Sequence, residues 1–183
     1  MTHPLDERDR SEILRIARAT LREHLTTGYL PPGAPHRPSL LQPAGAFVTL
    51  RVDGQLRGCM GRVDADKPLY LAVEELTVAA ATRDPRFDPL RLEEIKQTRI
   101  SVSILSTVEP AALDDIEIGK HGVVITRGPR RGLLLPQVAV EHGFTREQFL
   151  DETCGKAGLP PGAWREAGTL LQRFTADIIS EPA

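Results

Sequence analysis

The chain has 183 residues, a formal net charge of −2, 40% hydrophobic residues and 26% charged residues. This balance is typical of a globular domain with an apolar core, and it excludes a general electrostatic attraction to nucleic acid or to an anionic membrane. No stretch approaches the ~18 apolar residues of a membrane-spanning helix, and the charged segment Met1–Arg10 is unlike a secretory signal. With only two cysteines and no zinc-binding spacing, we expect a cytoplasmic protein with reduced thiols and no metal.

The first predicted element is a helix from about Asp6 to Thr26. Leucine and alanine side chains recur on one face of it, and charged residues lie opposite. Gly28 is a typical helix end. The segment from Pro31 to Pro43 is too rich in proline for a helix or a central strand, so we expect a loop there.

A β-hairpin is predicted over residues 46–60, with Asp53-Gly54 as its turn. The next helix is expected to begin near Pro68, with Asp66 as its cap. The second strand of the hairpin therefore leads through a glycine-containing segment, residues 58–61, toward the N-terminus of a helix. Free N–H groups and the helix dipole favour anions at such a place.

The second half of the chain predicts further hairpins and helices. Prolines at 85 and 89 exclude regular structure between residues 82 and 90. The elements expected after it are a short helix at 91–97, a strand at 100–108, a hairpin with strands at 122–127 and 132–135, helices at 136–142 and 145–157, and a closing strand at 170–179. Hairpins followed by helices, without regular βαβ alternation, predict an α+β fold with largely antiparallel sheets and two lobes.

The segment Leu56-Arg57-Gly58-Cys59-Met60-Gly61 is the strongest indication of a functional site. Its glycines allow a positive φ and the close approach of another group. The arginines on either side of the thiol, Arg57 and Arg62, favour a thiolate over a thiol. Two interpretations of Cys59 stay open: it is a nucleophile or redox-active thiol, or it is a small buried side chain at a strand end.

The turn Arg83-Asp84-Pro85-Arg86-Phe87 is the second candidate. A rigid turn that presents two arginines suits a carboxylate or phosphate ligand. The alternative is an internal latch, in which an arginine pairs with a nearby carboxylate. We expect a latch for one of the two arginines and ligand contact for the other.

His121, at the start of the second hairpin, is a candidate general base for Cys59, and a structural histidine is the alternative. Cys154 lies in a predicted amphipathic helix, which favours a buried structural role. The short motifs typical of P-loop, dinucleotide-binding, zinc-protease and serine-hydrolase sites do not occur.

Seven short blocks of the sequence match a known family, in the same order along the chain. They are FVTL at Phe47–Leu50, LRGCMG at Leu56–Gly61, RDPRF at Arg83–Phe87, SVSILS at Ser101–Ser106, HG at His121–Gly122, LLPQVA at Leu134–Ala139 and KAGL at Lys156–Leu159. LRGCMG resembles the LRGC(I/V)G signature of the AMMECR domain family. The resemblance extends over nearly the whole chain.

This resemblance implies a single domain over residues 1–183, built as an α+β fold of two lobes, with the LRGCMG segment facing a cleft between them. It also implies partners, because bacterial and archaeal relatives resemble one member of a three-part set that includes a Memo-like protein and a radical SAM protein. It implies neither a reaction nor a cofactor.

Two functions are therefore weighed against each other. The first is an enzyme or enzyme component that binds an anionic small molecule in the cleft. Its catalytic residues would be Cys59 and His121, and its binding residues would be Arg57, Gly58, Gly61, Arg83, Asp84 and Arg86. The second is a non-catalytic protein that docks a partner. RNA or nucleotide binding rests on arginine content alone and is the remote alternative.

Overall fold

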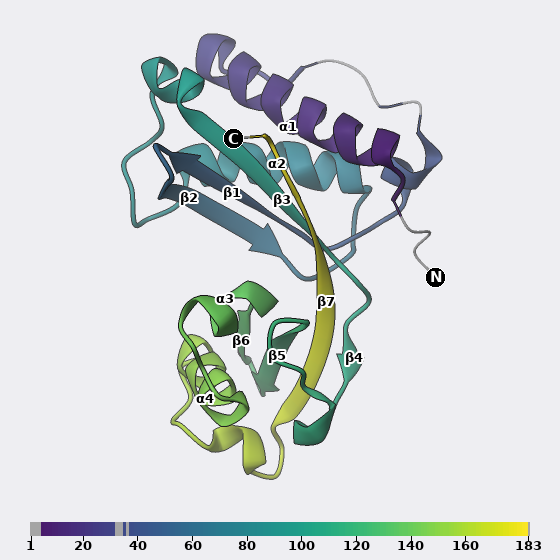
Figure 1. Ribbon diagram of the computed structural model, residues 1–183, viewed down its shortest axis with the longest axis vertical. Helices are drawn as coiled ribbons and strands as arrows, with labels where there is room; N and C mark the ends of the chain where they lie inside the picture. The colour runs from purple at the N-terminus through teal and green to yellow at the C-terminus, as the bar shows by residue number, and fades with distance from the viewer. Residues whose placement is uncertain (1–4, 32–34, 36, 183) are drawn as a thin grey trace. The chain divides into compact units, whose positions relative to one another are not determined.

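The computed structural model describes residues 5–31, 35 and 37–182, and it confirms the α+β class (Figure 1). The chain divides into two compact units. Unit 1 contains the described residues up to Ile104 and those from Asp177 on, and unit 2 contains Leu105–Ala176. Unit 2 is thus inserted into the chain of unit 1. The described residues include no helix that is long and apolar enough to cross a membrane.

Helix α1 (Glu7–Thr27) begins and ends as the sequence predicts. The Asp6 side chain accepts a hydrogen bond from the Asp9 N–H and caps the helix, which ends at Gly28 in the left-handed conformation with a φ of 81°. The predicted loop that follows contains a short 3-10 helix, η1 (Pro38–Leu41), and its residues 32–34 and 36 lie outside the described part.

Helix α2 (Leu69–Thr82) does not have the cap that the sequence predicts. Pro68 occupies the N-cap position, and no side chain accepts a hydrogen bond there. Asp66 does not cap the helix, because its carboxylate pairs with Arg62 at 3.0 Å. After α2, the predicted short helix is the 3-10 helix η2 (Leu92–Lys96).

The sheet of unit 1 contains β1 (Ala46–Val52), β2 (Gln55–Arg62), β3 (Thr98–Leu105) and the end of β7 (Leu170–Ser180), in the order β2-β1-β3-β7. Helix α2 packs on β1 and β2, and α1 packs on α2 (Figure 1). Side chains alternate along β1. Val48 and Leu50 are buried in the core beneath the helices, and Phe47 and Thr49 lie on the opposite face of the sheet.

A β-bulge at Arg57 breaks the register of the predicted hairpin. From the turn, Arg51 pairs with Leu56, but Leu50 then pairs with Gly58, so that Arg57 is the extra residue of β2. Beyond the bulge, Cys59 pairs with Thr49. Directly opposite residues share a face of the sheet, so the bulge puts the thiol on the face away from the core.

Both glycines of the LRGCMG segment permit close approach, as predicted, but neither adopts a positive φ. A Cβ atom on Gly58 would lie 2.0 Å from the carbonyl oxygen of Ala80 in α2. A Cβ atom on Gly61 would lie 2.0 Å from the ring of Phe47. The glycines are therefore needed for packing against a helix and an aromatic ring.

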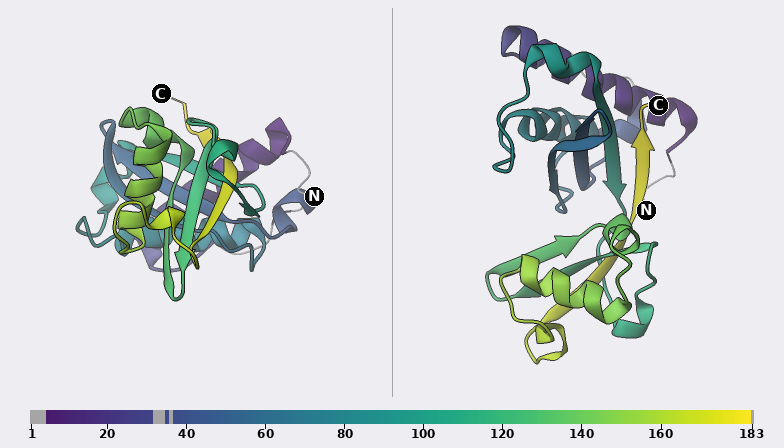
Figure 2. Two further views of the ribbon diagram at one scale, coloured as in Figure 1. Left: turned by 90° about the horizontal axis from the view of Figure 1, so that it is seen from below. Right: turned by 60° about the vertical axis from the view of Figure 1, so that its left-hand side comes forward.

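Unit 2 contains a smaller sheet, in which β7 pairs with β5 (His121–Arg127) and β5 with β6 (Arg130–Leu134). The short strand β4 (Glu109–Pro110) pairs with β7. Helix α4 (Arg146–Lys156) packs against β5 and β6 and encloses a second apolar core, and the short helix α3 (Pro136–Glu141) contacts β5 (Figure 2). The predicted capping box between Thr145 and Gln148 is present at the start of α4.

Replacing Gly58 with alanine is expected to lower the free energy of unfolding by about 3 kcal/mol or more, because the carbonyl of Ala80 belongs to a helix backbone and cannot easily move. Chemical denaturation measures the change. The matched control is Gly155→Ala in α4, where an added Cβ meets no atom within 4 Å. This control is expected to be unchanged or more stable by up to about 1 kcal/mol. Equal effects of the two substitutions would contradict the packing role of Gly58.

Candidate functional site

The LRGCMG segment lies on the edge strand of unit 1, against the C-terminal end of α2. Gly58 touches the carbonyl of Ala80 near the last turn of that helix. The sequence predicts an anion site where this segment approaches the N-terminus of a helix. That prediction is wrong for Cys59, because the neighbouring Gly58 lies against the C-terminal end of α2. The carbonyl groups at a helix C-terminus form the negative end of its dipole, which does not attract an anion.

Asp84, directly after α2, holds the edge strand through its carboxylate. Its Oδ2 accepts the N–H of Cys59 at 2.8 Å and Arg86 Nη2 at 2.7 Å. Its Oδ1 accepts the N–H of Arg86 at 3.1 Å and Arg86 Nε at 2.9 Å. Asp84 is only 5% exposed, and these bonds offset the cost of burying its charge.

The same contacts determine the protonation of the carboxyl group. Hydrogen bonds from the Arg86 side chain, and then from the N–H groups of Cys59 and Arg86, hold the pKa of Asp84 far below its ordinary value, although burial opposes them. The pKa of Arg86 is raised chiefly by its hydrogen bond with Asp84, with a smaller contribution from the charge of Cys59. Because Asp84 Oδ2 accepts from both groups, it holds the Arg86 guanidinium next to the backbone N–H of Cys59.

The two arginines of the turn have different surroundings. Arg86 forms the internal latch on Asp84 and also lies over the ring of Phe87, 5.5 Å from its centroid. Arg83 ends α2 and is exposed, and its guanidinium has no hydrogen bond or ion pair with any described residue. The expected ligand contact of Arg83 stays a prediction.

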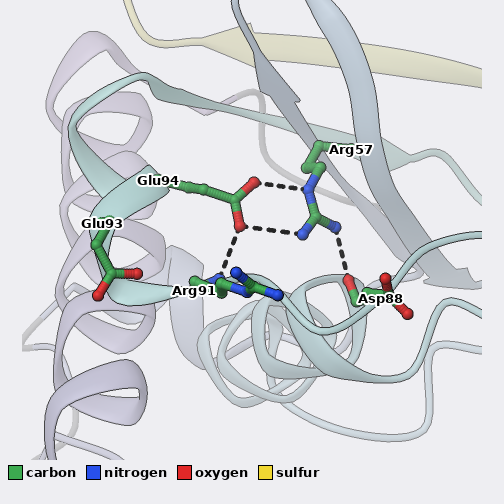
Figure 3. A pocket seen from close by; sticks show the side chains of 5 residues that line it. All are labelled: Arg57, Asp88, Arg91, Glu93 and Glu94. Atoms are coloured by element: carbon green, nitrogen blue, oxygen red, sulfur yellow. Dashed lines mark hydrogen bonds and ion pairs between the residues drawn. The ribbon is translucent and has the colours of Figure 1, made fainter.

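Arg57, the bulge residue, is held by the segment that follows the turn (Figure 3). Its Nε and Nη2 donate to the two carboxylate oxygens of Glu94 at 2.8 and 3.1 Å, and its Nη1 donates to the carbonyl of Asp88 at 2.7 Å. The hydrogen bond from Arg57, together with one from the Arg91 N–H, lowers the pKa of Glu94. Carboxylates thus offset the positive charge of Arg57 and, through Asp66, that of Arg62.

The thiol of Cys59 is half-buried and lies beside hydroxyl groups on the sheet face opposite α2. The Thr49 hydroxyl donates a hydrogen bond to Sγ at 3.4 Å. Ser101 lies opposite Thr49 on β3, and Ser180 on β7 donates to the Ser101 hydroxyl at 2.9 Å. One thiol and three hydroxyls therefore form a line across four strands, which we call the hydroxyl row.

His121 belongs to unit 2 and is bound there by its own turn. Its Nδ1 accepts the N–H of Glu117 at 3.0 Å, so the neutral ring carries its proton on Nε2. Burial, followed by the charges of Arg173 and Lys120, lowers its pKa, and the side chain is 8% exposed. With Nδ1 occupied and the proton on Nε2, the neutral ring can donate a proton but must release the Glu117 N–H before it can accept one, and the pairing of His121 with Cys59 stays a prediction.

A pocket of about 530 Å³ lies beside the bulge, lined by Arg57, Asp88, Arg91, Glu93 and Glu94 (Figure 3). Arg57 and Glu94 form one wall through their paired hydrogen bonds. Within the described ranges, no group of three or more histidine, cysteine or acidic side chains is arranged to hold a metal ion.

Sequence reasoning missed two neighbours of the candidate residues. Glu94 was one acidic residue among several in a predicted helix, and nothing in the local pattern ties it to Arg57. Thr49 lies in the FVTL block, but a regular hairpin counted from the Asp53-Gly54 turn pairs Cys59 with Val48 instead. Only knowledge of the bulge brings Thr49 beside the thiol.

Comparison with known proteins gives consistent likenesses. The family model described as AMMECR1 matches residues 14–179. A protein of Methanothermobacter thermautotrophicus is 40% identical over 97% of this chain and 97% of its own, and protein MJ0810 of Methanocaldococcus jannaschii is 44% identical over 75% of this chain and 73% of its own. The crystal structure of the uncharacterized protein PH0010 from Pyrococcus horikoshii has a TM-score of 0.88 and 38% identity, covering 93% of this chain and 90% of that one.

Replacing Asp84 with asparagine is expected to destabilise the protein by about 2 kcal/mol at neutral pH, because a buried acceptor of four hydrogen bonds loses its charge. The pKa of Asp84 is lowered by folding, so its contribution is present above the ordinary value of 3.8 and is lost as the pH falls further. The difference from wild type, measured by urea unfolding, should shrink below about pH 4.

The control for this pH series is Asp88→Asn on the same turn, since the Asp88 side chain is exposed. It is expected to change stability by no more than about 0.5 kcal/mol at any pH. A constant destabilisation of the Asp84 variant from pH 7 to pH 2 would show that the charge of Asp84 is not what stabilises the turn.

The two cysteines are expected to differ sharply in their reaction with iodoacetamide. Cys59 is half-buried on the sheet face opposite α2, whereas Cys154 is 0% exposed in the second core, where burial raises the pKa of its thiol. Peptide mass spectrometry should find alkylation of the native protein at Cys59 alone, and at both residues after denaturation. Protection of Cys59 equal to that of Cys154 would mean that the thiol is closed off.

Proposed function

The chain belongs to the AMMECR1 family, and from this premise we propose that it is an enzyme component that binds a small anionic molecule beside Cys59. The observation that carries the proposal is the half-buried thiol on the sheet face opposite α2, which accepts from the Thr49 hydroxyl and whose backbone N–H shares the Asp84 carboxylate with the Arg86 guanidinium. A reactive thiol needs access, a donor that stabilises its anionic form and a nearby cation.

The anion would be held by groups that the fold leaves available. Arg86 uses Nε and Nη2 for Asp84, and within the described ranges its Nη1 makes no hydrogen bond. Arg83 is exposed one residue before Asp84. The Ser101 hydroxyl offers a neutral donor, since the hydroxyls of Thr49 and Ser180 already donate to Cys59 Sγ and to Ser101. In the same proposal His121 moves a proton. A cytoplasmic location, where free thiols stay reduced, completes it.

The second candidate is a non-catalytic protein that docks partners such as a Memo-like protein and a radical SAM protein. It is favoured by one observation: the guanidinium groups of Arg57 and Arg86, expected to bind an anion, already pair with Glu94 and Asp84. These ion pairs tie the LRGCMG segment to its neighbours, which is a structural role. On this alternative, Cys59 has no ligand.

Native mass spectrometry of the protein purified from its own host tests the choice. We expect a retained small molecule on the wild-type chain, and about a tenfold lower occupancy in Cys59→Ser, which removes the sulfur, and in Arg83→Ala, which removes a guanidinium contact. The control is Arg99→Ala, an exposed arginine on β3. A bare wild-type chain, or an added mass that none of the variants alters, would contradict the proposal.

A further inference from the structure

The pocket beside the bulge carries an inference that does not rest on the proposed function. It is lined by five charged residues, two arginines and three acids, and Cys59 is not among them (Figure 3). Its volume of about 530 Å³ falls in the range of small-molecule sites. Only the charges that do not already pair within the protein are available to a ligand.

Two of the five are consumed by the fold. Arg57 is only 19% exposed and makes hydrogen bonds to Glu94 and to the carbonyl groups of Asp88 and Pro89. Glu94 accepts from Arg57 with both oxygens and from the Arg91 N–H with one of them. The charges of Arg57 and Glu94 neutralise each other, and their two hydrogen bonds make the pair a fixed wall of the pocket.

The other three side chains, those of Asp88, Arg91 and Glu93, are exposed at the pocket. None of the three side chains has a hydrogen bond or an ion pair with another described residue, although the Arg91 charge contributes to the lowered pKa of Glu94. In Figure 3 the guanidinium of Arg91 lies between the Arg57–Glu94 pair and Asp88, and it points toward the Asp88 side of the pocket. Arg91 and Asp88 therefore line the same pocket with opposite charges and form no ion pair with each other.

We propose that this pocket binds a free α-amino acid, with Arg91 on the ligand carboxylate and Asp88 on its ammonium group. The unengaged side chains carry one positive and two negative charges, so a simple anion would meet an excess of like charge. A zwitterion satisfies both signs at once. A planar guanidinium matches a carboxylate with two parallel hydrogen bonds, and a carboxylate accepts from an ammonium group. Glu93 adds negative charge that favours the ammonium end.

The Arg57–Glu94 wall explains why the site would be specific. Its hydrogen bonds fix the backbone that carries Asp88 and Arg91 relative to β2, so the two side chains start from fixed positions on the pocket rim. Ordering these exposed side chains around a ligand costs their rotamer freedom. Ligands that carry only one of the two charges would leave the other side chain unmatched.

The test uses the purified full chain and the twenty L-amino acids as probes, in saturation-transfer NMR at ~1 mM each. We expect transfer to at least one of them. For that amino acid, the N-acetyl derivative and the methyl ester, which each lack one charge, should bind about tenfold more weakly or worse. Arg91→Ala and Asp88→Asn should weaken binding by a similar factor without changing the melting temperature.

The control variants separate this site from the one proposed beside the thiol. Arg99→Ala, an exposed arginine outside the pocket, and Cys59→Ser should both leave amino-acid binding unchanged. The proposal is overturned if no amino acid shows transfer, if the N-acetyl derivative binds as well as its parent, or if neither pocket variant weakens binding. Loss of binding in Cys59→Ser would overturn the separate pocket, whatever the outcome for the anion beside Cys59.

Discussion

One extra residue in an edge strand decides where the thiol of this protein lies. Without the bulge at Arg57, the hairpin register counted from its turn would bring Cys59 opposite Val48, on the face that packs against α2. With it, the thiol lies opposite Thr49 on the other face. The bulge also re-aims the Arg57 side chain toward Glu94. The hydroxyl row and the wall of the charged pocket therefore both depend on the same local irregularity.

Two carboxylates keep the edge strand in this arrangement. Asp84 accepts the N–H of Cys59 and the Arg86 side chain, and Glu94 accepts the Arg57 side chain. The unpaired N–H groups of an edge strand can pair with a strand of another protein chain. In this protein, side chains from the segment after α2 occupy part of that edge. Arginines that look like ligand groups in the sequence thus serve largely to hold the backbone.

Regular elements were predictable because their signals are local. The Gly28 end of α1, the capping box of α4 and the Asp53-Gly54 turn each depend on a few neighbouring residues, and each is confirmed. The surroundings of Cys59 were not predictable in the same way. They depend on a bulge with no sequence signal of its own and on contacts with residues 25 to 37 positions further along the chain. The glycines were correctly predicted to be points of close approach, but Gly58 approaches the C-terminal end of α2 instead of a helix N-terminus, and Gly61 approaches the ring of Phe47.

The order of the two units along the chain bears on how the protein is made. Unit 2 ends at Ala176, whereas unit 1 also needs the residues that follow, among them Glu181 directly after β7, which pairs with Arg18 and accepts the N–H of Ile100. The unit whose chain begins first is therefore the one that is completed last. Truncation of only a few C-terminal residues would therefore damage the part of the protein that was translated first.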